Sequence, residues 1–297
     1  MNNLKIGYFA DGEWAHQAFK LLIEDKEMEI KFVCGRYESK YDTLKKISYS
    51  NNIDYLEYKN INSESFISHI EKYECDLFVS MSFDQIFKER VINLPRFKTI
   101  NCHAGKLPFY RGRNVLNWVL INDEKEFGIT VHYVDEGVDT GDIILQKVFD
   151  ITDEDNYNTL LTKAHKECAI LLYNAIKLIR EDKVKRMKQI NIHPYGFYCG
   201  IRKEGDEILK WNQPSRDIFN FVRAICKPGP MARGLLKGKV IKINFVRLIN
   251  DAPKYKGLPG QIIGKIDNGF VVKTLDSMIE VLEYEYEGFI KIGDRIE

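Results

Sequence analysis

Strands and helices alternate over residues 4–81, and this alternation constrains the fold more than any other feature of the chain. Short apolar runs typical of buried strands are separated by stretches with apolar residues at helical spacing. The expected strands are 4–10, 30–34, 54–56 and 76–81, and the helices between them are 14–24, 41–51 and one capped by Ser63. This order predicts an α/β domain with a mostly parallel, doubly wound sheet that binds ligands at the carboxyl ends of its strands.

A polar pair follows the next expected strand, 97–100. Asn101 and His103 are two residues apart, so their side chains leave the same face of the strand. A neutral amide and a titratable imidazole therefore point together. Cys102 lies between them and is expected on the opposite face, which disfavours a cysteine nucleophile.

Loops and two further strands continue this region. Residues 106–114 (KLPFYRGRN) have the proline and glycine of a loop, and Asn114 is expected to cap a helix. Strands are expected at 128–134 and 143–148, with Asp139 in the glycine-bounded loop between them. Asp139 therefore stands near a sheet end, where it either takes part in chemistry or merely bonds its own backbone in a turn. His132, within the first of these strands, is expected to be a packed, hydrogen-bonded residue.

The second half of the chain changes character. A long amphipathic helix is expected at 153–180, and 190–206 is loop-like. Residues 211–224 are expected to form a turn capped by Ser215 that leads into a helix. After it, short β runs alternate with Gly, Asn and Asp turns, which suggests a small β-barrel. We therefore expect a first domain over 1–189, a linker over 190–206 and a second domain over 207–297.

Composition and simple motifs argue against several classes of function. The 297 residues carry 44 Lys and Arg against 43 Asp and Glu, a net charge of +1, which argues against a general polyanion binder but not against a small anionic substrate. The six cysteines show neither a C-x-x-C pair nor metal-ligand spacing with the six histidines. Gly12 lacks the G-x-G-x-x-G context of nicotinamide binding. With no signal peptide or apolar run of membrane-spanning length, a cytoplasmic protein without a membrane partner is expected.

The motifs of residues 99–148 together resemble the N10-formyltetrahydrofolate-dependent formyltransferase family. An N-x-H pair, an LP-x-Y/W-R-G loop and a G-x-T…D-x-G-x-D-T-G run recur in that family, and its catalytic residues fall on Asn101, His103 and Asp139. The order W-x-x-x-S…I-x-N-x-V-R-A…P-G-P in the second half is similar to the OB-like C-terminal domain of such enzymes. The resemblance implies a Rossmann-like, mostly parallel catalytic domain followed by a small OB-like β-barrel.

The resemblance also implies a mechanism and a formyl donor. Formyl transfer to an amine passes through a tetrahedral intermediate and needs oxyanion donors and a proton acceptor. His103 is expected to be the general base, Asn101 to stabilise the oxyanion, and Asp139 to position His103 and a water. No metal is required. The donor, N10-formyltetrahydrofolate, is expected against Phe83, Gln85, Ile86, Asp135 and Gly137.

The formyl acceptor is expected to be a nucleotide-linked amino sugar. HAGKLPFYRGRNVLNW looks like the loop of sugar N-formyltransferases, which modify dTDP- or UDP-linked amino-deoxysugars for surface polysaccharides such as lipopolysaccharide O-antigen; a 4-amino-4,6-dideoxyhexose is favoured. A homodimer is expected by the same resemblance. The expected substrate-binding residues are Trp14, Lys106, Tyr110, Arg111, Arg223 and Lys227, while packing of its helix on the sheet is an equal alternative for Trp14.

Two other functions stay open at this level. Methionyl-tRNA formyltransferases carry a basic insertion after the second strand, whereas this chain has GRYESKYDTLKK there, and residues 206–297 carry fifteen Lys and Arg against twelve Asp and Glu, a weak footprint for a nucleic acid. A non-catalytic nucleotide-sugar-binding protein is the other alternative, and the intact Asn101, His103 and Asp139 argue against it.

Overall fold

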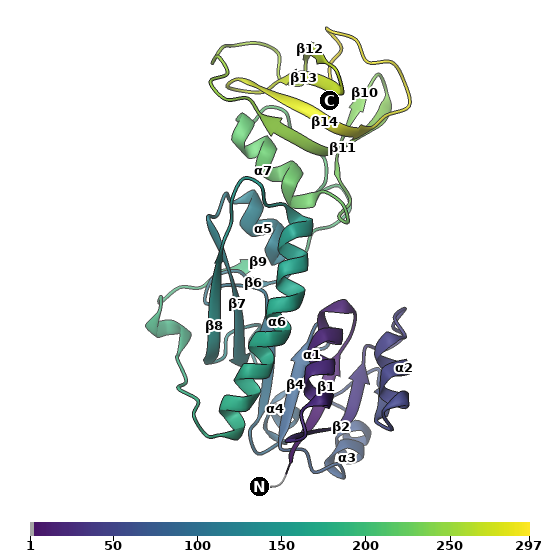
Figure 1. Cartoon of the computed structure of the whole chain (residues 1–297), viewed down its shortest axis with the longest axis vertical. Coiled ribbons are helices and arrows are strands. Elements are labelled where there is room, and N and C mark those ends of the chain that lie inside the picture. The colour runs from purple at the N-terminus through teal and green to yellow at the C-terminus, as the bar shows by residue number, and fades with distance from the viewer. Residues whose placement is uncertain (1–2) are drawn as a thin grey trace. The chain divides into compact units, whose positions relative to one another are not determined.

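The computed structural model describes residues 3–297, which form two compact units (Figure 1). Unit 1 comprises the chain up to Arg113 together with Phe127–Phe149 and Thr162–Cys199. Unit 2 comprises Asn114–Glu126, Asp150–Leu161 and Gly200–Glu297. Within residues 3–297, none of the helices is both long enough and apolar enough to cross a lipid bilayer.

Unit 1 is built on a seven-stranded sheet in the order β3-β2-β1-β4-β5-β7-β8. β1, β2, β3, β4 and β5 are parallel, and β7 runs antiparallel to β5. The strands are β1 (Leu4–Ala10), β2 (Met28–Gly35), β3 (Asp54–Glu57), β4 (Leu77–Met81), β5 (Thr99–His103), β7 (Glu126–Tyr133) and β8 (Ile143–Asp150). The mostly parallel, doubly wound sheet expected from the sequence is therefore confirmed.

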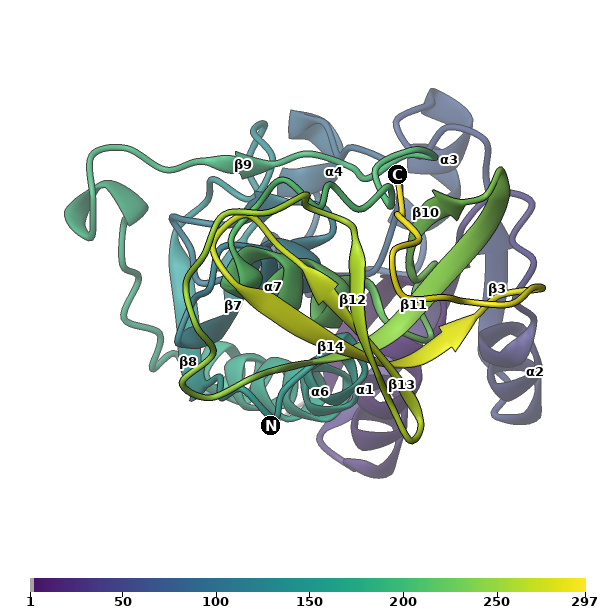
Figure 2. The same cartoon turned by 90° about the horizontal axis from the view of Figure 1, so that it is seen from above.

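Helices cover both faces of this sheet. They are α1 (Glu13–Glu24), α2 (Thr43–Ser50), α3 (Glu64–Glu71), α4 (Glu89–Asn93) and α6 (Tyr157–Arg180), the last beginning in unit 2. Figures 1 and 2 show α1 and α6 on one face and α3 and α4 on the other. Parallel strands covered on both faces explain why β1 and β4 are almost continuously buried and mostly apolar.

A cluster of aromatic rings fills the core between the sheet and α3 and α4. The ring of Phe9 packs edge-on against those of Phe32, Phe78 and Phe87 at centroid distances of 5.5, 5.2 and 5.0 Å. Such edge-to-face pairs add about 0.5–1.5 kcal/mol each beyond the burial of their area. The cluster gives unit 1 a rigid base below the carboxyl ends of β1 and β4.

Three short elements complete unit 1, one before the long helix α6 and two after it. They are β6 (Arg111–Gly112), the 3₁₀ turn η1 (Gln189–Asn191) and β9 (Tyr198–Cys199). β6 and β9 pair in parallel, with Arg111 opposite Tyr198 and Gly112 opposite Cys199. Residues 190–206 are thus not entirely loop, because part of this segment is fixed to the 104–112 loop by backbone hydrogen bonds.

Unit 2 contains a five-stranded antiparallel sheet in the order β10-β11-β14-β13-β12. Its elements are α5 (Val115–Ile121), α7 (Ser215–Ile225), β10 (Ala232–Leu236), β11 (Lys239–Leu248), β12 (Ile262–Ile266), β13 (Gly269–Lys273) and β14 (Met278–Glu285). The C-terminal residues pair with both edges of this sheet. Ile296 bridges Leu236 of β10, and Arg295 bridges Gln261, which lies just before β12. The small β domain expected from the sequence is confirmed.

One expected helix start and one expected side-chain cap are wrong. The long helix begins at Tyr157 rather than at 153, because Asn156 caps it: its Oδ1 accepts the backbone N–H groups of Asn158 and Thr159 at 2.9 and 3.2 Å. Asn114 does precede α5, but its side chain makes no cap bond. Its Oδ1 instead accepts the backbone N–H of Arg202 at 2.9 Å.

Candidate active site

Strand pairing brings the predicted polar residues of unit 1 together. Asn101 and His103 lie on β5, and the antiparallel register places His132 of β7 directly opposite Asn101. Asp139 lies in the loop between β7 and β8, with its backbone in the left-handed region at φ 55°. Aspartate tolerates this conformation better than most residues, because its short side chain can bond locally.

The carboxylate of Asp139 is the centre of this cluster, and its side chain is only 11% exposed. Its Oδ2 lies 3.6 Å from His103 Nδ1 and accepts the backbone N–H of Gly112 at 2.8 Å. Its Oδ1 lies 3.4 Å from His132 Nε2 and 3.5 Å from Asn101 Nδ2. A buried carboxylate is thus surrounded by two imidazoles, an amide and a backbone donor.

The hydrogen-bond network assigns the protons of both histidines. His103 Nε2 lies 2.7 Å from the Tyr110 carbonyl, and His132 Nδ1 lies 2.8 Å from the Tyr133 carbonyl. A carbonyl only accepts, so each of these ring nitrogens carries a proton. The other nitrogen of each ring faces Asp139. A further proton taken up there creates an imidazolium beside the carboxylate.

The environment of Asp139 favours its ionised form. Burial by itself raises the pKa of this carboxyl. Charge interaction with His103, hydrogen bonding and charge interaction with His132, and the Gly112 N–H outweigh burial and hold the pKa well below its ordinary range. The carboxylate therefore stays charged at neutral pH and can stabilise a proton on either ring.

His132 is the member of the cluster that sequence reasoning did not assign to the site. It is buried and hydrogen-bonded, as expected, but its Nε2 also contacts Asp139 and lies 3.3 Å from Asn101 Nδ2. The alternation of Thr130 and His132 along β7 places both on one face, yet only the register with β5 brings His132 to Asn101. Cys102 lies away from the cluster, where its thiol donates to the Cys168 carbonyl of α6.

The residues expected against the donor are divided between two loops. After β4, the Phe83 ring packs on that of Phe9, with 5.6 Å between centroids, and Ile86 is 60% exposed. The Gln85 amide is engaged structurally, because it accepts from Ile61 N at 3.0 Å and donates to the Tyr58 carbonyl at 2.8 Å.

The other loop holds Asp135 and Gly137. Asp135 Oδ1 accepts the backbone N–H of Gly137 at 3.2 Å and the hydroxyl of Thr140 at 2.5 Å. These bonds close a tight turn that spans Asp139. The turn and the side chain of Asp139 thus serve different purposes, since Asp135 bonds the local backbone while Asp139 faces the histidines.

Four of the residues expected at the substrate lie in unit 1. The Trp14 ring packs edge-on against that of His165, 4.5 Å between centroids, and Lys106 Cβ lies against Gly128. The Tyr110 ring is buried against Phe197 at 4.8 Å. Arg111 follows, with its guanidinium 5.5 Å from the centroid of the Tyr198 ring. Tyr110 and Arg111 thus join the aromatic segment 197–198 to the Asp139 cluster.

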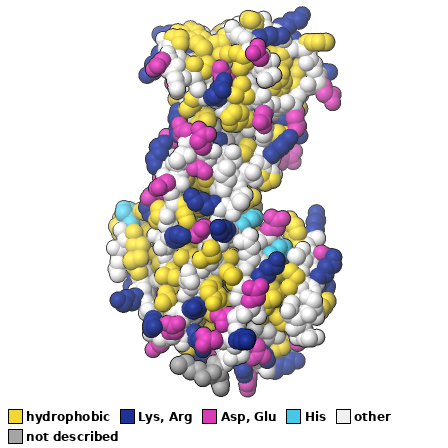
Figure 3. Space-filling view, viewed as in Figure 1, with side chains coloured by type: hydrophobic (Ala, Val, Ile, Leu, Met, Phe, Trp, Pro, Cys, Tyr) yellow, Lys and Arg dark blue, Asp and Glu magenta, His cyan; other side chains and the backbone are white. Residues whose placement is uncertain are grey.

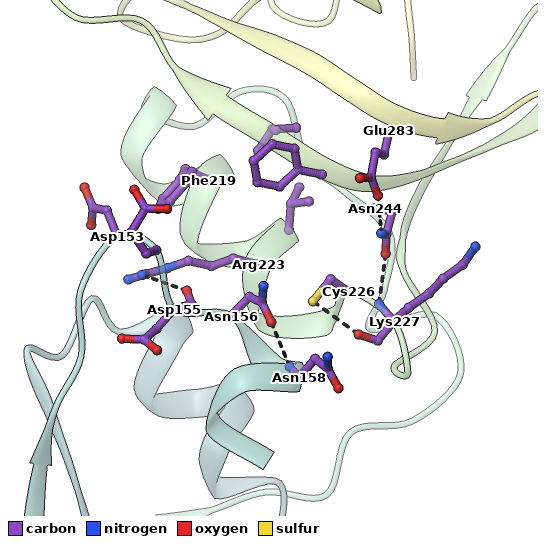
Figure 4. Close-up of a pocket in the computed structure, with 14 residues that line it drawn as sticks. Asp153, Asp155, Asn156, Asn158, Phe219, Arg223, Cys226, Lys227, Asn244 and Glu283 are labelled. Atoms are coloured by element: carbon purple, nitrogen blue, oxygen red, sulfur yellow. Dashed lines mark hydrogen bonds between the residues drawn. The ribbon is translucent and has the colours of Figure 1, made fainter. Parts of the chain in front are cut away.

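The remaining two, Arg223 and Lys227, belong to unit 2 and line a pocket of about 410 Å³ (Figure 4). Arg223 is 5% exposed and donates to the carbonyls of Thr152 and Asp155 at 2.7 and 3.2 Å. Lys227 pairs with Glu285 at 2.8 Å. Both cations are thus already engaged within unit 2, and neither lies in the unit that carries Asp139.

Two family models match this chain. Residues 9–176 match the family described as formyl transferase, and residues 201–292 match the formyl transferase C-terminal domain. A methionyl-tRNA formyltransferase of Fusobacterium nucleatum is 32% identical over 270 residues, which is 86% of this chain and 86% of that protein.

Solved structures share the fold. A sugar 3N-formyl transferase, solved in the presence of dTDP and 5-N-formyl-THF, has a TM-score of 0.69 at 24% identity and covers 95% of this chain and 98% of its own. An N-formyltransferase of Helicobacter canadensis, solved with folinic acid and dTDP-3-aminofucose, has a TM-score of 0.70 at 20% identity, covering 95% of this chain and 100% of its own.

Proposed function

Because this chain belongs to the formyl transferase family, we propose that it transfers a formyl group from N10-formyltetrahydrofolate to the amine of a nucleotide-linked amino sugar. The proposed acceptor is a dTDP- or UDP-linked amino-deoxysugar, with a 4-amino-4,6-dideoxyhexose favoured, made in the cytoplasm for surface polysaccharide. The two solved enzymes, one with dTDP and 5-N-formyl-THF and one with folinic acid and dTDP-3-aminofucose, support a folate donor and a dTDP-linked amino sugar, with the amine at C-3 in both.

The Asp139 cluster has the groups that this reaction needs. The amine must lose a proton when it attacks the formyl carbon, and His103 Nδ1 can hold that proton next to the Asp139 carboxylate, 3.6 Å away. His103 Nε2 is occupied by the Tyr110 carbonyl, so proton acceptance uses the nitrogen that faces Asp139. We assign to Asp139 the stabilisation of the resulting imidazolium.

Asn101 is the proposed donor to the developing oxyanion. Its Nδ2 contacts to His132 and Asp139 are 3.3 and 3.5 Å long, near the limit of hydrogen bonding, so a formyl oxygen can replace one of them at small cost. An oxyanion is a stronger acceptor than the neutral imidazole that it displaces. The amide therefore binds the transition state better than the ground state.

The choice of a nucleotide-linked acceptor rests on the β6–β9 pair. It fixes two partly exposed rings, Phe197 (43%) and Tyr198 (56%), next to the Arg111 guanidinium, while the adjoining Gly112 N–H contacts Asp139. An aromatic surface suits a nucleobase and a guanidinium suits a diphosphate. Arg111 adjoins Gly112, whose N–H contacts Asp139, and Tyr198 is paired with Arg111 across the two strands.

Methionyl-tRNA is the second candidate acceptor, and the names of the relatives at 29–34% identity favour it. Two structural features favour the sugar instead. Only residues 36–42 connect β2 to α2, so the basic insertion of the tRNA enzymes has no counterpart. In unit 2, several cations are paired with carboxylates, as in Arg233–Glu207, Lys237–Asp294 and Arg247–Glu280.

A mass measurement tests the proposal. The protein is incubated with N10-formyltetrahydrofolate and, separately, with dTDP- and UDP-linked 3-amino and 4-amino sugars or with methionyl-tRNA. We expect a gain of about 28 Da, one CO unit added by acyl transfer, on an amino sugar. A gain confined to methionyl-tRNA would replace the sugar by the second candidate, and no gain on any acceptor would leave the non-catalytic alternative.

The same assay tests the assigned roles. His103→Ala and Asp139→Asn should each lower kcat/KM by about 10²–10⁴-fold, the usual contribution of positioned acid–base groups. Asp182→Asn is the matched control, because Asp182 is an exposed aspartate of the same unit, has the same left-handed backbone at φ 53°, and lies outside the expected donor and substrate residues. Activity in the His103 or Asp139 variant equal to that of the control would contradict the assignment.

A further inference from the structure

Gln189 is a buried polar residue of unit 1 that no motif assigns to the active site. It begins the η1 turn and is 5% exposed. It lies in the stretch 177–200, between the two regions that match the family models. A buried glutamine is unusual unless its amide is fully hydrogen-bonded, so its partners indicate its purpose.

The side-chain amide of Gln189 joins the two loops of the proposed active site. Its Nε2 donates to the backbone carbonyls of Asp139 and Gly141, both at 2.8 Å. Its Oε1 accepts from Arg111 Nε at 3.1 Å and from Arg111 Nη2 at 2.6 Å. Both N–H groups and both lone pairs of the amide are thereby used.

Both loops hold backbone that is unfavourable without support. Asp139 and Tyr110 each have φ 55°, in the left-handed region that costs L-residues about 1–2 kcal/mol. Their conformations matter for the cluster, because the Tyr110 carbonyl accepts from His103 Nε2 and the Asp139 side chain faces both histidines. Such backbone persists only where its surroundings fix it.

The contacts of Gln189 meet this requirement at both places. On one side it holds the Asp139 backbone directly. On the other side it holds Arg111, which lies between Tyr110 and Gly112 in the chain. The Tyr110 carbonyl accepts from His103 Nε2, and the Gly112 N–H donates to Asp139. A carboxylate at this position would lack the two donors, and a cation would lack the acceptor for Arg111. Only a neutral amide of this length matches both sets of partners.

We propose that Gln189 is a positioning residue for formyl transfer, which fixes the 104–112 and 135–141 loops so that His103 and Asp139 keep their catalytic geometry. This inference rests on the proposed function for its kinetic consequences. Gln189 acts through the backbone of Asp139 and the side chain of Arg111, and has no direct role at the reacting atoms.

Two variants distinguish the hydrogen bonds that Gln189 donates from those that it accepts. Gln189→Met keeps the volume but removes all four hydrogen bonds. Gln189→Glu keeps an acceptor for Arg111 and removes both donors to the Asp139 and Gly141 carbonyls. Tyr173→Phe is the control, because it removes a side-chain hydrogen bond of the same unit, from Tyr173 to Asp25 at 2.7 Å, that does not touch these loops. Urea unfolding of all four proteins measures any general loss of stability.

Kinetics give the first readout. Both Gln189 variants should lower kcat by about 10- to 100-fold, the effect of misplacing reacting groups, with KM of the amino sugar changed far less. Tyr173→Phe should change stability only.

Hydrogen exchange of the Gly112 amide gives a readout independent of activity. Its N–H is bonded to Asp139 Oδ2, so exchange should be at least about 10-fold faster in both Gln189 variants and unchanged in Tyr173→Phe. Wild-type kcat and wild-type Gly112 exchange in the folded variants would overturn the proposal. A wild-type protein that formylates none of the tested acceptors would refute the proposed function instead, while the exchange measurement would still decide the role of Gln189.

Discussion

At the scale of single residues, the charge of Asp139 depends on the two histidines around it. Its folded-state pKa is depressed, so the stability that it contributes is present above its unfolded pKa of about 3.9 and is lost as pH falls below that value. Asp139→Asn should therefore lower the free energy of unfolding at pH 7 by on the order of 2 kcal/mol, and the difference from wild type should shrink by pH 3.

Urea unfolding at pH 7, 5 and 3 measures this difference. The exposed Asp182→Asn variant serves again as the control and should differ little from wild type at any of these pH values. A difference between wild type and Asp139→Asn that is equal at pH 7 and pH 3 would show that the histidines do not stabilise the carboxylate.

At the scale of elements, the β6–β9 pair needs glycine at one position. Gly112 has φ 92°, and a Cβ there would stand 2.7 Å from the Cys199 carbonyl oxygen. Gly112→Ala should push β9 away and weaken the N–H bond to Asp139, lowering kcat/KM by about 10-fold or more. Gly200→Ala, where a Cβ meets nothing within 4 Å, should retain wild-type kcat/KM in the same assay. Equal kcat/KM in the two variants would contradict the requirement for glycine at position 112.

A second prediction at this scale concerns the stability that the cap at the start of α6 contributes. Asn156 accepts two backbone N–H groups of the first turn, so Asn156→Ala should lower the free energy of unfolding by about 1 kcal/mol. The change should appear as a lower urea midpoint with an unchanged slope. Asn158→Ala, at an exposed position of the same turn, is the control. If both alanine variants unfold at the same midpoint, the cap contributes nothing.

At the scale of the whole molecule, charge balance bears on the choice of acceptor. The net charge is +1, and acidic and basic side chains are interspersed on the face of unit 2 shown in Figure 3. A protein that neutralises 6–10 phosphates loses about 10³–10⁵-fold in affinity between 50 and 200 mM salt. A diphosphate held by one guanidinium should lose far less.

We therefore expect kcat/KM for the amino-sugar substrate to fall by less than about 10-fold between 50 and 200 mM NaCl. Methionyl-tRNA, assayed in parallel, is the comparison. A steep salt dependence on the substrate that the protein actually formylates would indicate a broad phosphate contact and favour the tRNA alternative. The ion pairs of unit 2, including Lys227–Glu285, give the physical reason for expecting a shallow dependence.

Local patterns in the sequence determined the class of the fold. The buried strands of unit 1 read as apolar runs, Ser63 caps α3 by accepting from Phe66 N, and the alternation along β5 separates Cys102 from Asn101 and His103. Each of these features depends on neighbours within a few residues, so the sequence alone contains them. The alternation along the strand also identified the polar pair, whereas the catalytic roles of the pair and of Asp139 rest on the family resemblance, which compares spacing along the chain.

Only the tertiary structure decided how these residues meet. His132 joins the site because β7 pairs with β5 in one particular register, and Gln189 joins it because η1 packs against two loops far away in sequence. Neither relation has a local signature, since strand register and the burial of a polar side chain are set by packing between distant segments. The sequence by itself determined which groups are present, and tertiary packing decided their geometry and the ionised state of Asp139.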